Sequence, residues 1–158
     1  MAANMGHTAP DDDWLGKLDE AILEPDLAII DPHHHLWLRN GYTYLMPELA
    51  LDLASGHNIV ATVFAECHSM YRQTGPEAER SLGETEFVRG QAAMSAGGQF
   101  GATRACEVMF GNVDMTLGGN VKTLLESHME ASAGRFHGVR FSAGWDAHEA
   151  INNVAPSP

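Results

Sequence analysis

The stretch "LAIIDPHHHLW" at residues 27–37 joins a short apolar run to three consecutive histidines. The run "LAIID" is typical of a buried strand, and Pro32, which lacks an N–H, fits the end of a strand better than its middle. Alternate side chains of an extended chain point to opposite faces. His33 and His35 therefore share one face, and His34 is expected to point the other way, toward a covering helix.

The rest of the chain alternates between strand-like and helix-like patterns. Strands are predicted at 59–67, 104–115 and 136–144, and helices at 44–58, 84–96 and 120–134. A short helix is also predicted at 14–23, before the first strand, where Pro25 would end it. Units of roughly 35 to 40 residues in this order predict βα units around a parallel sheet, without β-hairpins.

The composition narrows the class of protein. The 158 residues carry a formal net charge of −12. So acidic a chain repels phosphate groups, which argues against nucleic-acid binding and against docking on an anionic membrane. The two cysteines, Cys67 and Cys106, make no disulfide framework, and the N-terminus lacks the features of a signal peptide, so a cytoplasmic location is expected. No apolar run approaches the roughly 18 residues of a membrane span.

His33 and His35 are candidate metal ligands. They would lie ~6.6 Å apart along a strand, and their imidazoles could converge on one metal ion at ~2.0–2.1 Å per nitrogen. Asp31 has the same parity and could accept a hydrogen bond from a histidine ring. In βα folds the C-terminal ends of the strands form the working face, which is where these histidines lie. The alternative is a polar turn that binds nothing.

Three further side chains are candidates for binding a substrate. Glu66 and His68 follow the second strand and share a parity, so they could bind metal, accept a proton or hold a substrate hydroxyl. Arg140 follows the fourth strand, and its planar guanidinium suits a substrate carboxylate. The alternatives are the start of a surface loop for the first two residues and an ion pair with Asp146 for Arg140. Cys67 between them is expected to be a small core residue.

For the other conspicuous side chains, the sequence gives less specific predictions. Trp37 could form the wall of a pocket or cover the rim of the fold. His137 is expected before the fourth strand in a structural role, and His128 on a helix in contact with solvent.

The opening "IIDPHHHLW" resembles the D-x-H-x-H-x-W motif of the amidohydrolase-related family, with the match at Asp31, His33, His35 and Trp37. That family comprises metal-dependent hydrolases of TIM-barrel fold, among them sugar lactonases and a pyrone-dicarboxylate lactonase. The stretches "VATVFAECHSMYR", "GETEFVRG" and "FHGVRFSAGWD" resemble a branch of the same family. The likeness extends from about residue 29 to residue 146.

The resemblance implies the N-terminal half of a (β/α)8 barrel, with about four parallel strands and intervening helices. His33 and His35 would hold a divalent metal ion, zinc or manganese, although some lactonases of the family use these histidines without metal. Family members take further ligands and the general base from later strands, here beyond Pro158. The chain is therefore expected to be an incomplete part of the enzyme and inactive alone.

The expected domain organisation has three parts: an N-terminal extension at 1–26, the partial barrel at 27–146 and a truncated loop at 147–158. The expected function is opening of a lactone or related ester of a small carboxylic or sugar acid. The alternatives are a non-oxidative decarboxylase of the same fold and a non-catalytic fragment that pairs with another chain. Four strands leave two bare sheet edges, so association of two copies is a further possibility.

Overall fold

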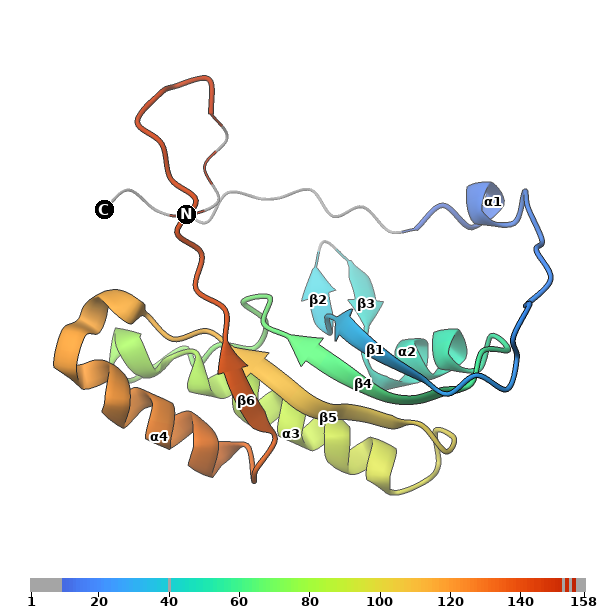
Figure 1. The fold of residues 1–158 in the computed structure, drawn as a ribbon. Coiled ribbons are helices and arrows are strands. Elements are labelled where there is room, and N and C mark those ends of the chain that lie inside the picture. Colours follow the sequence, from blue (N-terminus) through green and yellow to red (C-terminus); the bar gives the residue numbers. More distant parts are fainter. Residues whose placement is uncertain (1–9, 40, 152, 154, 156–158) are drawn as a thin grey trace.

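The computed structural model describes residues 10–39, 41–151, 153 and 155 (Figure 1). Its centre is a four-stranded sheet in which each strand runs parallel to its neighbours. The strands stand in the order of the chain: β1 (Ile29–His34), β4 (Ile59–Ala65), β5 (Arg104–Gly111) and β6 (Phe136–Val139). The prediction of an α/β fold with about four parallel strands is confirmed.

Three helices lie together on one side of this sheet: α2 (Met46–Leu53), α3 (Leu82–Ala96) and α4 (Val121–Ala131) (Figure 1). The main core forms between helices and sheet, where Phe64 and Met109 pack with Leu49 and Val88. Two short 3-10 helices, η1 (Glu77–Glu79) and η2 (Met115–Asn120), lie in the connections. The predicted helices at 44–58, 84–96 and 120–134 are therefore present, with shorter or shifted ends.

The opposite face of the sheet carries apolar side chains that remain exposed. Ile30, Val60 and Phe110 lie one residue along from the positions that face the helices, and all three are accessible to solvent. Apolar side chains contribute to stability in proportion to the area that they bury, and these three bury little. Among the described residues, helices thus cover one face of the sheet only.

Strand β1 is longer at its C-terminal end than predicted. It continues through Pro32 to His34, and its pairing with β4 shifts in register between Asp31 and His34. A proline is tolerated because β1 is an edge strand, where no second neighbour needs its N–H. The other predicted strands end earlier than expected, at Gly111 and Val139, and His137 lies within β6 and not before it.

A β-hairpin follows β1, so the prediction of a fold without hairpins is wrong. Strands β2 (Trp37–Arg39) and β3 (Tyr42–Tyr44) pair antiparallel. The residues between them in the sequence are Asn40 and Gly41, a dipeptide that two-residue hairpin loops favour, and Gly41 has a positive φ of 79°. The signal was present in the sequence.

The N-terminal helix is also shorter than predicted. Helix α1 covers Asp12–Leu15, and the side chain of Asp11 accepts a hydrogen bond from the backbone N–H of Trp14. Leu18 and Leu23, which would have extended it, are exposed. A helix without a surface to pack against is marginal in water, which explains why it stops. No helix within the described residues is long and apolar enough to cross a membrane.

His128, expected in solvent, is instead completely buried. Its Nδ1 lies 2.8 Å from the hydroxyl of Thr85 and its Nε2 lies 3.1 Å from the hydroxyl of Ser81, both on or beside α3. Its ring stacks on Phe136 of β6. Burial lowers the pKa of His128 to about 4, so the neutral imidazole joins α4 to α3 and to the sheet.

This burial predicts a specific loss of stability in acid. The unfolded chain protonates a histidine near pH 6.5, whereas the folded chain protonates His128 only near pH 4. Between these values the unfolded state binds more protons than the folded state. The free energy of unfolding therefore decreases as the pH is lowered, by on the order of 3 kcal/mol in total for this residue. Urea denaturation between pH 7 and pH 4 should show a shallower decline in His128→Gln. An unchanged decline would contradict the assignment, and His137→Gln, at an exposed histidine, is the control.

Candidate functional site

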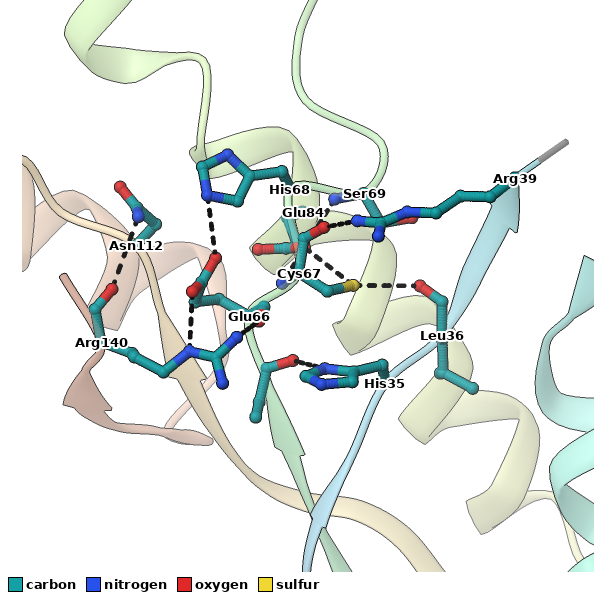
Figure 2. A network of polar contacts seen from close by, with 11 residues as sticks. His35, Leu36, Arg39, Glu66, Cys67, His68, Ser69, Glu84, Asn112 and Arg140 are labelled. Carbon is teal, nitrogen blue, oxygen red and sulfur yellow. Dashed lines mark hydrogen bonds and ion pairs between the residues drawn. The ribbon is translucent and has the colours of Figure 1, made fainter. Parts of the chain in front are cut away.

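The predicted site residues gather at one edge of the sheet. His33 lies near the end of β1 and His35 directly after it, Glu66 comes directly after β4, and Arg140 comes directly after β6. Parallel strands bring their C-terminal ends to the same edge, and Figure 2 shows His35, Glu66 and Arg140 grouped there. The structure therefore brings these predicted site residues together at the C-terminal edge of the sheet.

The two histidines of the pair face each other. The Nε2 atoms of His33 and His35 are 3.3 Å apart. The Nδ1 of His35 lies 2.8 Å from the backbone oxygen of Ala65. A carbonyl oxygen only accepts, so Nδ1 carries the proton and Nε2 presents its lone pair, which is the form of histidine that binds metals.

Asp31 acts on the backbone and not on a ring. Its Oδ1 accepts a hydrogen bond of 3.0 Å from the backbone N–H of His33. The expectation that Asp31 orients a histidine ring is therefore wrong. The short bond spans two residues and stabilises the turn of the chain into the histidine pair.

His35 is held by an aromatic side chain as well. Its ring stacks on Trp37, with centroids 5.2 Å apart, and the guanidinium of Arg39 lies 4.9 Å from the centroid of Trp37 on β2. Burial lowers the pKa of His35, and the neighbouring His33 and Arg140 lower it further. Trp37 is thus a wall of this site, and His35 is neutral at neutral pH.

His34 points away from the pair, as predicted, and is buried against the helix side of the sheet. The backbone N–H of Cys106 donates to the hydroxyl of Thr62 at 2.9 Å, and that hydroxyl lies 2.8 Å from Nε2 of His34. The hydroxyl accepts from the amide and shares a second hydrogen bond with the ring. Burial lowers the pKa of His34 to about 4, so this histidine anchors β1 in its neutral form.

Glu66 and Arg140, predicted separately as substrate contacts, hold each other. The Nε of Arg140 donates to Oε1 of Glu66 at 2.7 Å, and Nη2 donates to the backbone oxygen of Glu66. Glu66 is 3% exposed, whereas the side chain of Arg140 is 45% exposed. The alternative ion pair with Asp146 is not found among the described contacts. The pairing orients the guanidinium and leaves Nη1 without a hydrogen bond to any described residue.

His68 approaches the other oxygen of the same carboxylate. Its Nε2 lies 3.5 Å from Oε2 of Glu66, on the side opposite Arg140 (Figure 2). Its ring stacks on Tyr71, with centroids 5.3 Å apart, and its side chain is 64% exposed. Glu66 therefore lies between a guanidinium and an imidazole.

Glu84 on α3 is a site residue that the sequence analysis missed. Its Oε1 accepts hydrogen bonds from the backbone N–H groups of Cys67, at 3.0 Å, and Ser69, at 2.8 Å. It is 2% exposed, and burial raises its pKa to about 7. Cys67 is a buried core residue, as predicted, and its thiol pKa is raised to about 12, also by burial. The sequence signal was an acidic residue in the first turn of a helix, which is too common to single out.

Arg39 was missed in the same way. Its guanidinium donates to the backbone oxygen of Cys67. Because Arg39 belongs to the hairpin that was not expected, no pattern in the sequence connected it with the end of β4. The hairpin and α3 thus hold the loop after β4 from two sides.

The histidine pair offers two nitrogen ligands to a metal ion. Two ligands at ~2.0–2.1 Å in tetrahedral arrangement are ~3.3 Å apart, which fits the 3.3 Å between the two Nε2 atoms. Within the described part of the chain, no group of three or more His, Cys, Asp or Glu is placed to hold a metal ion.

Comparison with known proteins gave no match to a protein-family model, to a curated protein or to a solved structure.

The two hydrogen bonds that Glu84 accepts from backbone N–H groups predict a contrast between two variants. Glu84→Ala leaves two buried N–H donors without an acceptor, which costs about 1–3 kcal/mol for each. Glu84→Gln keeps an acceptor of the same shape and should lose far less. Chemical denaturation of both variants at pH 8, where Glu84 is charged, measures the difference. Equal losses would show that the hydrogen bonds do not hold the loop.

A second contrast concerns two glycines of α3. A Cβ at Gly83 would lie 2.5 Å from the backbone oxygen of Met70 and 2.7 Å from the backbone nitrogen of Arg72, whereas a Cβ at Gly90 would meet nothing within 4 Å. Gly83→Ala should therefore lower the free energy of unfolding by about 1–3 kcal/mol. Gly90→Ala should raise it by up to about 1 kcal/mol. Thermal denaturation of the two variants tests this, and equal effects would refute the close packing at Gly83.

Proposed function

We propose that the chain forms half of a (β/α)8 barrel of the amidohydrolase-related type. Three observations support this. The strands follow one another in chain order, and α2, α3 and α4 lie on one side of the sheet. A doubly wound sheet would instead reverse its strand order and carry helices on both faces. Apolar side chains such as Ile30 and Phe110 on the free face would fill the interior of a closed barrel.

Within that fold we propose a hydrolase that opens a lactone or related ester of a small carboxylic or sugar acid. The observation that carries the proposal is the histidine pair, with its Nε2 atoms 3.3 Å apart and Nδ1 of His35 bonded to Ala65. This arrangement leaves the ring nitrogen of His35 that faces His33 unprotonated. The resemblance assigns a metal pair to these two histidines.

His33 and His35 would hold a divalent ion, zinc or manganese. Such an ion supplies polarisation of a carbonyl group and a lowered pKa for a bound water. In the metal-free variant of the proposal, the same two nitrogens hold the substrate through hydrogen bonds. The remaining ligands, and the other four strands, would come from a part of the protein outside this chain or from a second copy.

Arg140 would hold a carboxylate of the substrate. Its Nε and Nη2 are already directed by Glu66, so the exposed edge of the guanidinium, with Nη1, is available at a fixed angle. An arginine fixed in advance loses less conformational entropy when it binds an anion. Glu66 thus acts on the substrate through Arg140 and through His68. A small-molecule substrate handled in this way fits the expected cytoplasmic location.

The role proposed for His33 and His35 is tested by the double variant His33→Ala, His35→Ala in the full-length protein. Calorimetric titration with Zn²⁺ and with Mn²⁺ should show binding that the double variant loses. Turnover of a panel of γ- and δ-lactones bearing a carboxylate should fall by at least about 100-fold, because interactions made in the transition state contribute on that scale. His137→Ala, at an exposed histidine of β6, is the matched control. Unchanged turnover in the double variant would overturn the assignment.

A non-oxidative decarboxylase is the second candidate. The specific feature in its favour is the position of Arg140 on the side of Glu66 that faces His35 (Figure 2), which would present a bound carboxylate to the histidine pair. Release of carbon dioxide from aromatic acids, with no lactone opening, would favour it. A non-catalytic fragment that pairs with another chain through its bare sheet face would show neither reaction, and it would associate in solution.

A further inference from the structure

We propose that Glu84 is a positioning residue for the arginine that would hold the substrate carboxylate. At and below neutral pH it carries a proton and donates it to the carboxylate of Glu66, which directs Arg140. The inference rests on the proposed function and deepens it, because it makes binding of the substrate carboxylate depend on the protonation of a buried side chain. Glu84 touches no substrate and acts through Glu66.

The two carboxylates lie against the same peptide group (Figure 2). Oε1 of Glu84 accepts a hydrogen bond of 3.0 Å from the backbone N–H of Cys67, which belongs to the peptide bond that joins Glu66 to Cys67. The charge of Glu66 also acts on the carboxyl group of Glu84. Glu66 is 3% exposed and Glu84 is 2% exposed, so little water separates or screens them.

Each carboxyl group has one oxygen with hydrogen-bond donors and one without. Oε1 of Glu84 accepts from two backbone N–H groups, and Oε1 of Glu66 accepts from Nε of Arg140. The Oε2 atom of each is buried and has no hydrogen bond to any described residue. Buried acceptors without a donor are costly and need an explanation. A proton on one Oε2 turns that oxygen into a donor to the other, so a single proton satisfies both.

The proton belongs on Glu84 and not on Glu66. The guanidinium of Arg140 neutralises Glu66, whereas Glu84 has no cationic partner among the described contacts. Burial raises the pKa of Glu84 to about 7, and the charge of Glu66 raises it as well, against the opposing effect of the two backbone N–H groups. Two adjacent buried carboxylates resist carrying two negative charges at once. Glu84 is therefore protonated below about pH 7, and Glu66 is its ionised partner.

Three other titratable side chains face the pair. The thiol of Cys67 lies 3.6 Å from Oε1 of Glu84 and not beside Oε2. Nε2 of His68 is 3.5 Å from Oε2 of Glu66, but this side chain is 64% exposed. The hydroxyl of Tyr71 is buried and bonds to no described residue. Groups on the other packed elements bind the same loop or α3 itself: Arg39 of the hairpin, Arg140 after β6 and His128 of α4.

Loss of the proton would disturb the arginine. Above about pH 7 Glu84 becomes charged and repels Glu66. Because Oε1 of Glu66 binds Nε of Arg140 at 2.7 Å, displacement of this carboxylate releases the guanidinium from its fixed direction. The added negative charge also weakens the attraction for an anion. A substrate carboxylate should therefore bind more weakly as the pH rises through 7.

The experiment compares the wild-type full-length protein with Glu84→Gln. Glutamine has the shape of a protonated glutamate, with one oxygen that accepts and an NH2 group that donates, and it cannot ionise. The measured quantity is KM for lactones that bear a carboxylate, divided by KM for matched lactones without one. In the wild type this ratio should rise at least about tenfold between about pH 6 and about pH 8. In Glu84→Gln it should stay constant, while kcat keeps the same pH profile in both proteins.

Two further variants separate this role from a general effect on folding. Glu84→Ala has neither acceptor nor donor, so the KM ratio should be high at both pH values, and the contrast with Glu84→Gln shows rescue by the conservative variant. Glu86→Gln makes the same change at an exposed residue of α3 that pairs with Arg72. This control should keep the pH dependence of the wild type.

A second readout does not depend on turnover. Infrared spectra of the wild-type protein should show the C=O band of a carboxylic acid at about pH 6 that is lost by about pH 8, where exposed Asp and Glu are ionised throughout. Glu84→Gln should lack this band. The NMR signal of the Arg140 Nε–H reports the bond to Glu66. Its exchange with solvent should be equally slow in both proteins at the lower pH and faster in the wild type at the higher pH.

Every outcome bears on the inference. A KM ratio that does not change with pH in the wild type, or that still changes in Glu84→Gln, overturns it. A pH dependence that disappears in His68→Asn but persists in Glu84→Gln assigns the proton to His68 and overturns it too. A wild-type protein that opens no lactone overturns the proposed function. The infrared band and the Arg140 signal then decide the inference alone: both as expected support it, and the absence of either overturns it.

Discussion

The buried hydrogen bond between Thr62 and His34 decides which way the histidine triplet faces. The Thr62 hydroxyl is itself held by the backbone N–H of Cys106, so three neighbouring strands, β1, β4 and β5, meet at one imidazole. Because alternate side chains of an extended chain face opposite sides, fixing His34 on the helix side directs His33 and His35 to the other face of the sheet. The bond from Nδ1 of His35 to Ala65 then selects the tautomer of His35. The candidate site therefore depends on packing beneath it.

The loop after β4 is also positioned by a buried polar side chain, in this case Glu84. A carboxylate is costly to bury unless its oxygens find donors, and Glu84 finds two in the backbone on either side of His68. The helix that carries Glu84 can approach because Gly83 has no side chain to meet Met70 and Arg72. Burial of one acidic group thus shapes a turn that presents two polar side chains, Glu66 and His68, at the sheet edge. The fold positions the site through residues that a substrate would never contact.

Much of this arrangement could be predicted from the sequence, and the failures have physical causes. Alternation of apolar strands with amphipathic helices predicted the parallel sheet, and strand parity predicted the convergence of His33 with His35. The prediction for Asp31 was wrong because its short side chain reaches the backbone N–H of His33, two residues away, more easily than a histidine ring. His128 was placed in solvent because its neighbours on the helix are acidic, and no local pattern showed that the hydroxyls of Ser81 and Thr85 would meet it. Glu84 and Arg39 act on residues distant in sequence, and such pairings appear only once the chain is folded.

The order of the strands has a consequence for how the chain is made. Each strand of the sheet pairs with the strand that precedes it, from β1 through β4 and β5 to β6, with only the small β2–β3 hairpin between the first two. A chain that leaves the ribosome from its N-terminus can therefore dock every new βα unit on an edge that has already formed. Each strand after β1 finds its partner in this sheet already synthesised, so these four strands can assemble during translation.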